Sequence, residues 1–271
     1  MPTETSLFPA ALDGRAVDAA DLSPLAFAGF AHFTAIQVRD RKIRGLDLHL
    51  KRLHNASLDF FGRALPEDLL RSRIRQAVNA GPPDQSLAVT IFSPKGEFTA
   101  DSMQGDLSVL VRGGPPSNGP KGPLRLAVVE HERPHATIKH VGESGKTYYL
   151  HQAIRAGFDD AAFINRQGRL SEASIWNLVF WDGEAVIWPK AEMLTGTMMG
   201  TVQRQLERLG VPQRQEEITL ERLETLSGAA VMNSWTPGIA VSAIGSMAFP
   251  DARAFMDLLH RAHAAEPAEH V

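Results

Sequence analysis

The stretch WNLVFWDGEAVIW, residues 176–188, contains two short apolar runs on either side of Asp182-Gly183. An Asp-Gly pair between runs rich in Val, Ile and aromatic residues is typical of the tight turn of a β-hairpin. We therefore predict that strands 176–181 and 185–188 are antiparallel neighbours. A sheet that contains such a hairpin is not the wholly parallel sheet of a doubly wound fold.

The same pattern continues on both sides of this hairpin. Apolar runs predict further strands, and apolar periodicity predicts helices. The strands are expected at 124–129, 161–165, 229–232 and 239–244, and the helices at 147–156, 198–209 and 219–226. Because tight turns join many neighbouring strands, we expect a mixed α/β (α+β) fold with mixed or antiparallel sheets.

The first 111 residues also combine strands and helices. A strand at 33–38 is followed by Asp40-Arg41-Lys42 and a second short strand, which together predict a hairpin. Asp47 is predicted to cap one helix and Pro66 to begin the next. Two strands, 87–92 and 107–111, complete this part.

A segment rich in Gly and Pro, RGGPPSNGPKGP at residues 112–123, interrupts these patterns. Such a composition predicts a linker without regular structure. The expected organisation is an N-terminal domain at 1–111, the linker at 112–123 and a C-terminal domain at 124–271. We expect the last residues, from Ala264 onward, to be frayed.

Composition excludes several classes of protein. The formal net charge of −3 gives no basic excess for binding nucleic acid. The chain has no cysteine and its ten histidines form no HExxH pattern, so no metal site is predicted. No apolar run is long enough to span a bilayer, and the first residues do not resemble a signal peptide. We expect a soluble, cytoplasmic protein without membrane or nucleic-acid partners.

One short motif suggests nucleotide binding. Residues 142–147, GESGKT, resemble the end of a phosphate-binding P-loop. The full pattern needs another glycine where His140 stands, and a strand just before the loop, where 133–136 reads RPHA. A turn that leads into a helix is the better interpretation.

Lys139 and Glu172 taken alone would be interpreted as solvated surface charges. Lys139 and Glu172 lie in two of five separated segments that are considered together. In chain order these segments are LDLHLKRL (46–53), IKH (138–140), EASIWNLVF (172–180), LTGTM (194–198) and MNSWT (232–236). These segments resemble the class IV aminotransferases, the fold-type IV enzymes that use pyridoxal 5′-phosphate (PLP). The family includes branched-chain and D-amino-acid aminotransferases and aminodeoxychorismate lyase. The resemblance extends from about Leu12 to Ile244.

The resemblance implies a role for each matched residue. Lys139 corresponds to the lysine that forms the Schiff base with PLP, Arg52 binds the phosphate, and Glu172 pairs with the pyridine nitrogen. The remaining cofactor contacts are expected from the start of the 198–209 helix and from the late turn, at Thr197, Met198, Asn233 and Ser234. The resemblance also implies a small N-terminal α/β sandwich, a larger C-terminal α/β pseudo-barrel, PLP in the cleft between them, and a homodimer.

Elementary chemistry agrees with these roles. Lysine is the side chain that supplies an amine to the PLP aldehyde, and the freed amine can then move the substrate α-proton if it is partly desolvated. A carboxylate beside the pyridine nitrogen keeps the ring a good electron sink. A phosphate dianion favours a helix N-terminus together with a fixed cation, here Arg52.

Two departures from the family pattern concern arginines. Met199 stands where an arginine is usual, which alters the support for the phosphate site. Residues 91–94 read IFSP, and no arginine lies near strand 88–93, where lyases and D-amino-acid aminotransferases of the family have one. Substrate specificity therefore does not carry over.

We expect an aminotransferase that exchanges an amino group between an amino acid and a 2-oxo acid. One alternative is a lyase that eliminates pyruvate from an aminodeoxychorismate-like substrate. Another is a cofactor-free descendant of the fold that acts as a binding or structural protein. The absence of the two family arginines is the reason to consider this alternative.

Overall fold

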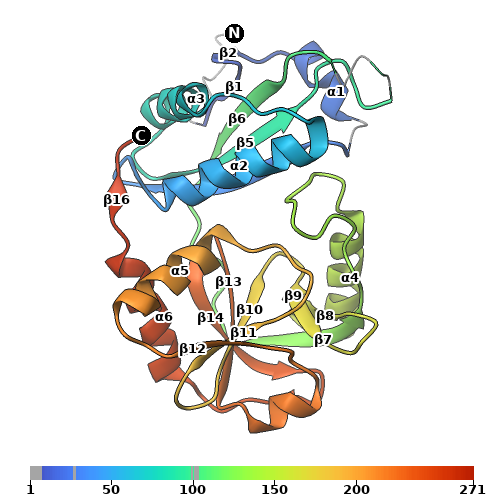
Figure 1. Ribbon diagram of the computed structural model, residues 1–271, viewed down its shortest axis with the longest axis vertical. Coiled ribbons are helices and arrows are strands. Elements are labelled where there is room, and N and C mark those ends of the chain that lie inside the picture. Colours follow the sequence, from blue (N-terminus) through green and yellow to red (C-terminus); the bar gives the residue numbers. More distant parts are fainter. Residues whose placement is uncertain (1–7, 27–28, 99, 101–103) are drawn as a thin grey trace. The chain divides into compact units, whose positions relative to one another are not determined.

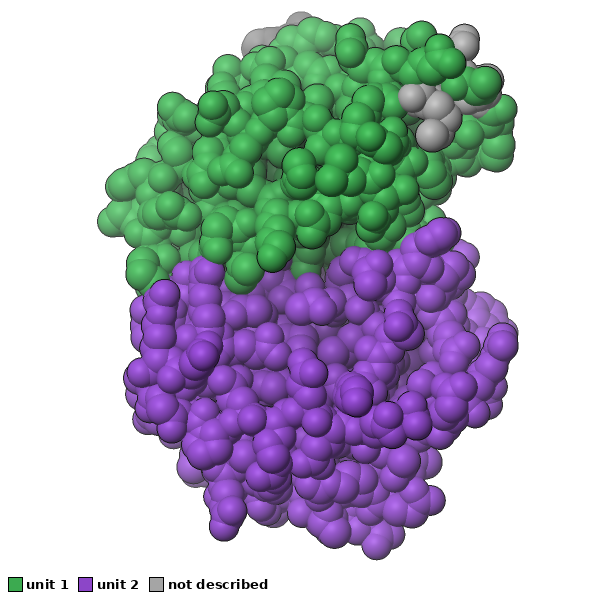
Figure 2. Space-filling view, in the orientation of Figure 1, with its two compact units in different colours: residues 1–117, 138–143, 267–271 green, residues 118–137, 144–266 purple. Residues whose placement is uncertain are grey.

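The computed structural model describes residues 8–26, 29–98, 100 and 104–271. The chain divides into two compact units (Figure 2). Unit 1 comprises residues 1–117, 138–143 and 267–271, and unit 2 comprises residues 118–137 and 144–266. Within the described ranges, no helix is both long and apolar enough to cross a membrane.

Unit 1 contains an antiparallel sheet of seven strands in the order β16-β4-β3-β5-β6-β1-β2. Figure 1 shows its strands β5 and β6 beside the helix α3. Its strands are β1 (Ala10–Leu12), β2 (Arg15–Ala16), β3 (His32–Arg39), β4 (Lys42–Arg44), β5 (Gln85–Phe92), β6 (Ser108–Gly114) and β16 (Ala268–Glu269). Its helices are the 3-10 helix η1 (Ala20–Leu22), α1 (Ser23–Ala26), α2 (Leu46–Phe61) and α3 (Glu67–Ala80). The predicted hairpin after residue 39 is confirmed as β3–β4.

The core of unit 1 lies between one face of this sheet and the helices α2 and α3. Side chains of β3 alternate between buried and half-buried, as expected for a strand with one face against a core. Ile36 and Val38 pack with Leu50 and Leu53 of α2. The N-cap of α2 is Gly45 in the left-handed region, at φ 65°. The prediction that Asp47 caps this helix is therefore wrong: Asp47 lies in the first turn, where its charge suits the helix dipole.

Unit 2 is built on a mixed sheet that closes on itself. The strands follow the order β10-β13-β14-β7-β8-β9, and β9 pairs again with β10 through Glu172 and Asn177. These strands are β7 (Leu124–Glu130), β8 (Asp160–Ile164), β9 (Leu170–Ala173), β10 (Asn177–Trp181), β13 (Gly228–Asn233) and β14 (Thr236–Ile244). Three more extend the sheet: β11 (Val186–Pro189), β12 (Gln213–Glu216) and β15 (Met247–Ala248). The predicted mixed sheet and pseudo-barrel are confirmed.

Alternating side chains divide the core of unit 2 between the two faces of the barrel. Leu178 and Phe180 of β10 belong to one apolar cluster, whereas Val179 between them packs against the helices outside. The first cluster therefore fills the barrel. The outer helices are α4 (Ser144–Arg155), α5 (Thr197–Arg208) and α6 (Arg253–Ala265). The predicted helix at 219–226 is a short 3-10 helix, η3 (Glu221–Thr225).

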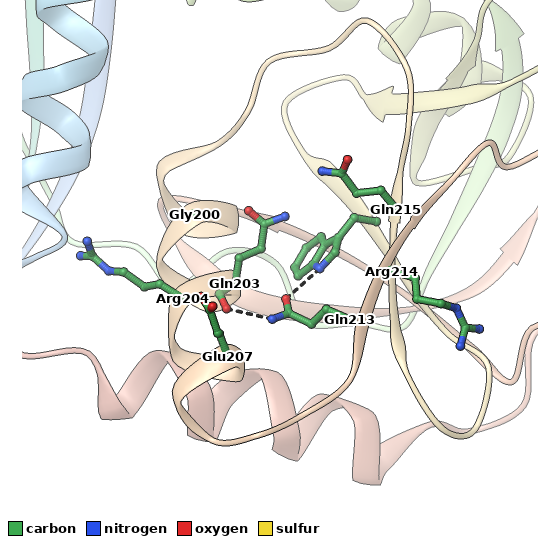
Figure 3. A pocket seen from close by; sticks show the side chains of 8 residues that line it. Gly200, Gln203, Arg204, Glu207, Gln213, Arg214 and Gln215 are labelled. Carbon is green, nitrogen blue, oxygen red and sulfur yellow. Dashed lines mark hydrogen bonds between the residues drawn. The ribbon is translucent and has the colours of Figure 1, made fainter.

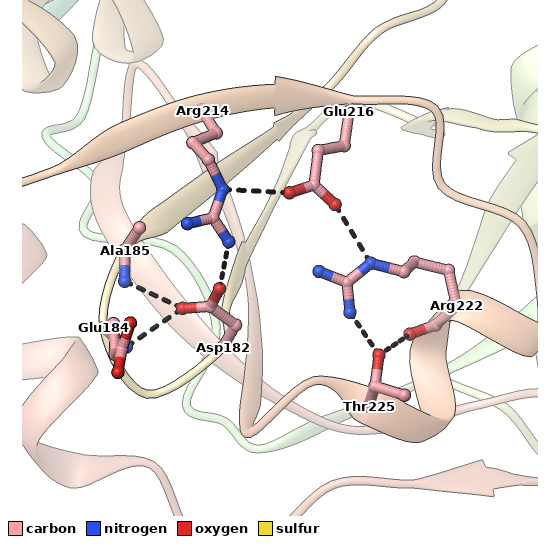
Figure 4. Close-up of polar contacts among 7 residues, drawn as sticks. All are labelled: Asp182, Glu184, Ala185, Arg214, Glu216, Arg222 and Thr225. Atoms are coloured by element: carbon pink, nitrogen blue, oxygen red, sulfur yellow. Dashed lines mark hydrogen bonds and ion pairs between the residues drawn. The ribbon is translucent and has the colours of Figure 1, made fainter.

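The hairpin predicted at 176–188 is confirmed as β10–β11, and a network of charges supports its turn (Figure 4). Burial raises the pKa of Asp182, but the backbone N–H groups of Ala185 and Glu184 and the Arg214 guanidinium outweigh it, so the pKa is lowered. Arg214 also donates to Glu216 over 3.1 Å. The network ties the hairpin turn to β12.

Three predictions about chain organisation need correction. Residues 112–114 of the expected linker belong to β6, because they complete the ladder with β5 despite two glycines. Residues 138–143, placed in the C-terminal domain by prediction, join unit 1. The chain end is ordered: Glu266 is buried against Gln205 at 2.5 Å, and β16 pairs with β4.

Candidate active site

Lys139 lies in unit 1, where its backbone is joined to the start of β3. The Phe33 N–H donates to the Lys139 carbonyl over 2.8 Å, and the Val141 N–H donates to the Ala31 carbonyl over 2.8 Å. The Lys139 side chain is half-buried, and its Nζ lies 4.8 Å from the centre of the Phe33 ring. The negative face of an aromatic ring attracts such a cation. Phe33 thus helps to orient the amine.

His140, the next residue, supports the same segment. Its Nε2 lies 2.5 Å from Glu143 Oε1, and both side chains are largely buried. Its backbone forms a bridge with His32 on β3. The segment that carries Lys139 is therefore held by main-chain and side-chain contacts together.

Arg52, the expected phosphate ligand, lies half-buried on α2 beside His49. His49 Nδ1 is 2.7 Å from Thr34 Oγ1. Burial, and then the Arg52 guanidinium, lower the pKa of His49 to about 3, with Asp47 opposing. His49 is therefore neutral at neutral pH, and Arg52 provides the positive charge of this pair.

The buried histidines predict how stability depends on pH. Burial lowers the pKa of His32 to about 4, and the pKa of His49 is about 3, both below the usual 6.5. Each group therefore contributes stability that is complete above about pH 6.5 and is lost as pH falls toward the folded-state pKa, by about 1.4 kcal/mol per pH unit. The free energy of unfolding, measured with denaturant between pH 6 and 4.5, should fall less steeply with decreasing pH for His49→Gln than for the natural protein. Equal slopes of free energy against pH would contradict the lowered pKa of His49.

Glu172, the expected partner of the pyridine nitrogen, lies on β9 in unit 2 and is buried. Arg133 Nη1 lies 3.1 Å from Glu172 Oε1 and also donates to the Ala136 carbonyl over 2.8 Å. The side chains of Arg133 and Glu172 are only 2% and 7% exposed. An adjacent guanidinium favours the ionised carboxylate. Arg133 was not predicted from the sequence.

The start of α5 offers an anion-binding arrangement. The N-cap is Gly196, and no side chain caps the helix. A Cβ at Gly196 would overlap Asn177 Oδ1, and Asn177 Nδ2 donates to the Leu194 carbonyl over 2.6 Å, so this turn is tightly fixed. The first N–H groups of a helix have no partner within the helix and attract phosphate. The Thr197 and Ser234 hydroxyls lie 3.4 Å apart, so the structure brings these two predicted residues together.

The other predicted residues of unit 2, Met198 and Asn233, are neighbours in sequence of Thr197 and Ser234. Met198 is buried at the start of α5, and Met199 is also buried, within the core formed by α5 and α6. Met199 therefore contributes apolar surface to this core, at the position where the family pattern has an arginine. Asn233 Oδ1 accepts from the Trp235 N–H over 2.8 Å, so its side chain shapes the late turn.

A groove of about 400 Å³ lies elsewhere on unit 2 (Figure 3). Trp188, Gln203, Glu207 and Gln213 line it together with four neighbours, Gly200, Arg204, Arg214 and Gln215. Trp188 Nε1 donates to Gln213 Oε1 over 3.0 Å, so two of the lining side chains are joined. None of the predicted site residues lines this groove, so it does not form the candidate active site.

Comparisons with known proteins identify the class. The profile of amino-transferase class IV matches residues 31–244, and the chain therefore belongs to this family, whose members depend on PLP. No curated protein matched the chain.

Solved structures share the fold. A branched-chain aminotransferase from Thermoproteus uzoniensis with norvaline is similar, with a TM-score of 0.83, 21% identity and coverage of 94% of this chain and 93% of that one. A 4-amino-4-deoxychorismate lyase from Pseudomonas aeruginosa has a TM-score of 0.79 and 20% identity, covering 94% and 98%. Both activities therefore occur on this fold.

Proposed function

We propose that the protein is a PLP-dependent aminotransferase that transfers an amino group between an amino acid and a 2-oxo acid, with Lys139 as the covalent attachment of the cofactor. The observation that carries the proposal is the buried Glu172 carboxylate beside Arg133, in a chain of the class IV family. A homodimeric assembly and a cytoplasmic location are part of the same proposal.

Residues of unit 2 have the donors that the phosphate of the cofactor needs. The uncapped start of α5 and the hydroxyls of Thr197 and Ser234 provide donors for a phosphate. Arg52 would add a positive charge, and Met198 and Asn233 would complete the contacts. Glu172 would accept a hydrogen bond from the protonated ring nitrogen. When bound, PLP supplies an electron sink for the carbanion left after loss of the substrate α-proton.

Two residues of the chain, Lys139 and Arg133, would have different roles in the reaction. The Lys139 amine would remove the substrate α-proton and deliver it to the cofactor carbon that is bonded to the transferred nitrogen. The Phe33 ring limits the directions in which the amine can point. The Arg133 guanidinium holds the Glu172 carboxylate in one orientation, so that it need not reorganise during the reaction.

A lyase that releases pyruvate is the second candidate. Its support is the similarity to lyase structures from Pseudomonas aeruginosa and Legionella pneumophila, the latter described as a putative lyase with a TM-score of 0.78 and 20% identity. Both reactions need an amine, a carboxylate and a phosphate site, so these residues do not separate them.

Product analysis separates the two candidates. We expect the PLP-loaded protein to convert an amino donor to its 2-oxo acid, with one equivalent of pyridoxamine phosphate formed per site when no acceptor is present. Aminodeoxychorismate should release no pyruvate. Pyruvate release without an acceptor, and no conversion of any amino donor, would replace the aminotransferase by the lyase. Protein that binds no PLP would rule out both.

A further inference from the structure

One face of the unit 1 sheet carries the proposed reacting amine. Along β3, His32 and Ile36 are buried on the face that packs against α2, whereas Phe33 and Ala35 are half-buried on the opposite face. The Phe33 ring lies against Lys139 Nζ at 4.8 Å. Lys139 therefore presents its amine on the face opposite the helices.

The strand register places Arg112 on this same face. Ala35 pairs with Ala88 of β5, and Ala88 pairs with Arg112 of β6. Directly paired residues project to the same side of a sheet. The neighbour Val111 belongs to the core beneath the helices, as expected for a residue one position away. The sequence prediction had assigned Arg112 to a linker and missed this placement.

Arg112 is exposed, and no residue among those described forms a hydrogen bond or ion pair with its guanidinium. Arg39, on the same face, differs: it donates to Gln37 Oε1 over 3.0 Å and to the Ser117 carbonyl over 2.9 Å. Arg39 is thus engaged in holding the chain after β6. Arg112 keeps its donors available for an anion, and guanidinium groups match carboxylates in geometry.

The separation of Arg112 from Phe33, whose ring lies against the Lys139 amine, indicates which carboxylate suits Arg112. Arg112 lies two strands and two residues from Phe33, which corresponds to a Cα–Cα distance of about 12 Å in an ideal sheet. The α-carboxylate of an amino acid is attached to the carbon that carries the reacting nitrogen, and must stay near Lys139. A carboxylate at the far end of the substrate side chain is several bonds further from the reacting nitrogen, so it is the one that suits a cation at this distance.

We propose that Arg112 binds the side-chain carboxylate of a dicarboxylic amino acid or 2-oxo acid. This inference rests on the proposed function of Lys139. It gives the protein a substrate-binding arginine on β6, although residues 88–93 of β5 contain none. Arg112 is thus a specificity residue and takes no part in proton transfer.

Glutamate and norvaline provide a matched test, because they differ only by a carboxylate in place of a terminal methyl group. For Arg112→Gln we expect the KM for glutamate to rise roughly 10- to 100-fold, the effect of losing a hydrogen bond between charged groups. The kcat for glutamate and both constants for norvaline should stay within about twofold. Arg112→Lys should recover part of the loss. Arg75→Gln, at an exposed position on α3, is the control and should change nothing.

Binding without turnover provides a second readout. The dissociation constant of glutarate, measured by calorimetry on the PLP-loaded protein, should rise by the same factor in Arg112→Gln, with that of pentanoate unchanged. An unchanged glutamate-to-norvaline ratio in Arg112→Gln, with PLP still attached to Lys139, overturns this inference alone. Failure of the natural protein to accept glutamate overturns it too. Absence of PLP from Lys139 overturns the proposed function itself.

Discussion

Replacing Lys139 with alanine is expected to reduce amino-group transfer by more than about 10⁴-fold, since positioned general bases alone contribute up to that factor. The variant has no amine at residue 139 to attach PLP or to move the α-proton. Steady-state assays of the PLP-loaded variant measure the loss. Lys190→Ala removes an exposed lysine that follows β11 and should retain full activity.

Misfolding must be separated from loss of chemistry. Lys139→Met keeps the apolar stem that packs near Phe33 and should show the same loss of activity. Both variants should unfold at nearly the temperature of the natural protein, because the segment at 138–143 is held by its backbone hydrogen bonds to β3. Transfer at the natural rate in a folded Lys139→Met protein would refute the role of this amine.

Arg133→Met is expected to lower the free energy of unfolding by about 3–5 kcal/mol, the usual effect of leaving one charge of a buried pair without its partner. Arg133 and Glu172 lie 3.1 Å apart with almost no exposed surface. Urea unfolding of the apoprotein measures this change. Affinity for PLP should fall as well, because the Glu172 carboxylate loses the group that orients it.

Two controls make this prediction specific. Arg169→Met breaks a pair with Glu217 at 2.9 Å in which both side chains are more than a third exposed, so its effect should stay below about 1 kcal/mol. The double variant Arg133→Met with Glu172→Leu removes both buried charges and should be more stable than Arg133→Met alone. If Arg133→Met and Glu172→Leu lower the free energy of unfolding additively, the two buried charges do not stabilise each other as proposed.

Local patterns in the sequence predicted much of the fold. The apolar runs on either side of Asp182-Gly183 predicted the hairpin β10–β11, because turn chemistry and strand alternation both act between near neighbours. The strands for which bounds were predicted lie within a few residues of the observed ones, but the helix α6 (Arg253–Ala265) was not predicted. The short strand β9 was missed: its sequence, LSEA, has no β-branched residue, and its pairing with β8 and β10 makes it a strand.

Contacts between distant residues limited the prediction of the site. Motif order singled out Lys139 and Glu172 as candidates, and the structure shows that Glu172 is buried although it is a charged residue. Arg133 had no signal of its own, because its partner lies 39 residues further along the chain. Arg112 stands beside two glycines, and only the register of β6 reveals which face it occupies.

Borohydride reduction followed by peptide mass spectrometry tests the central claim most directly. The protein is loaded with PLP, reduced, digested and analysed for peptides that carry a phosphopyridoxyl group. The account predicts one modified residue per chain, Lys139, and loss of the visible absorbance band on reduction. A phosphopyridoxyl group on another lysine, or on none, would contradict it.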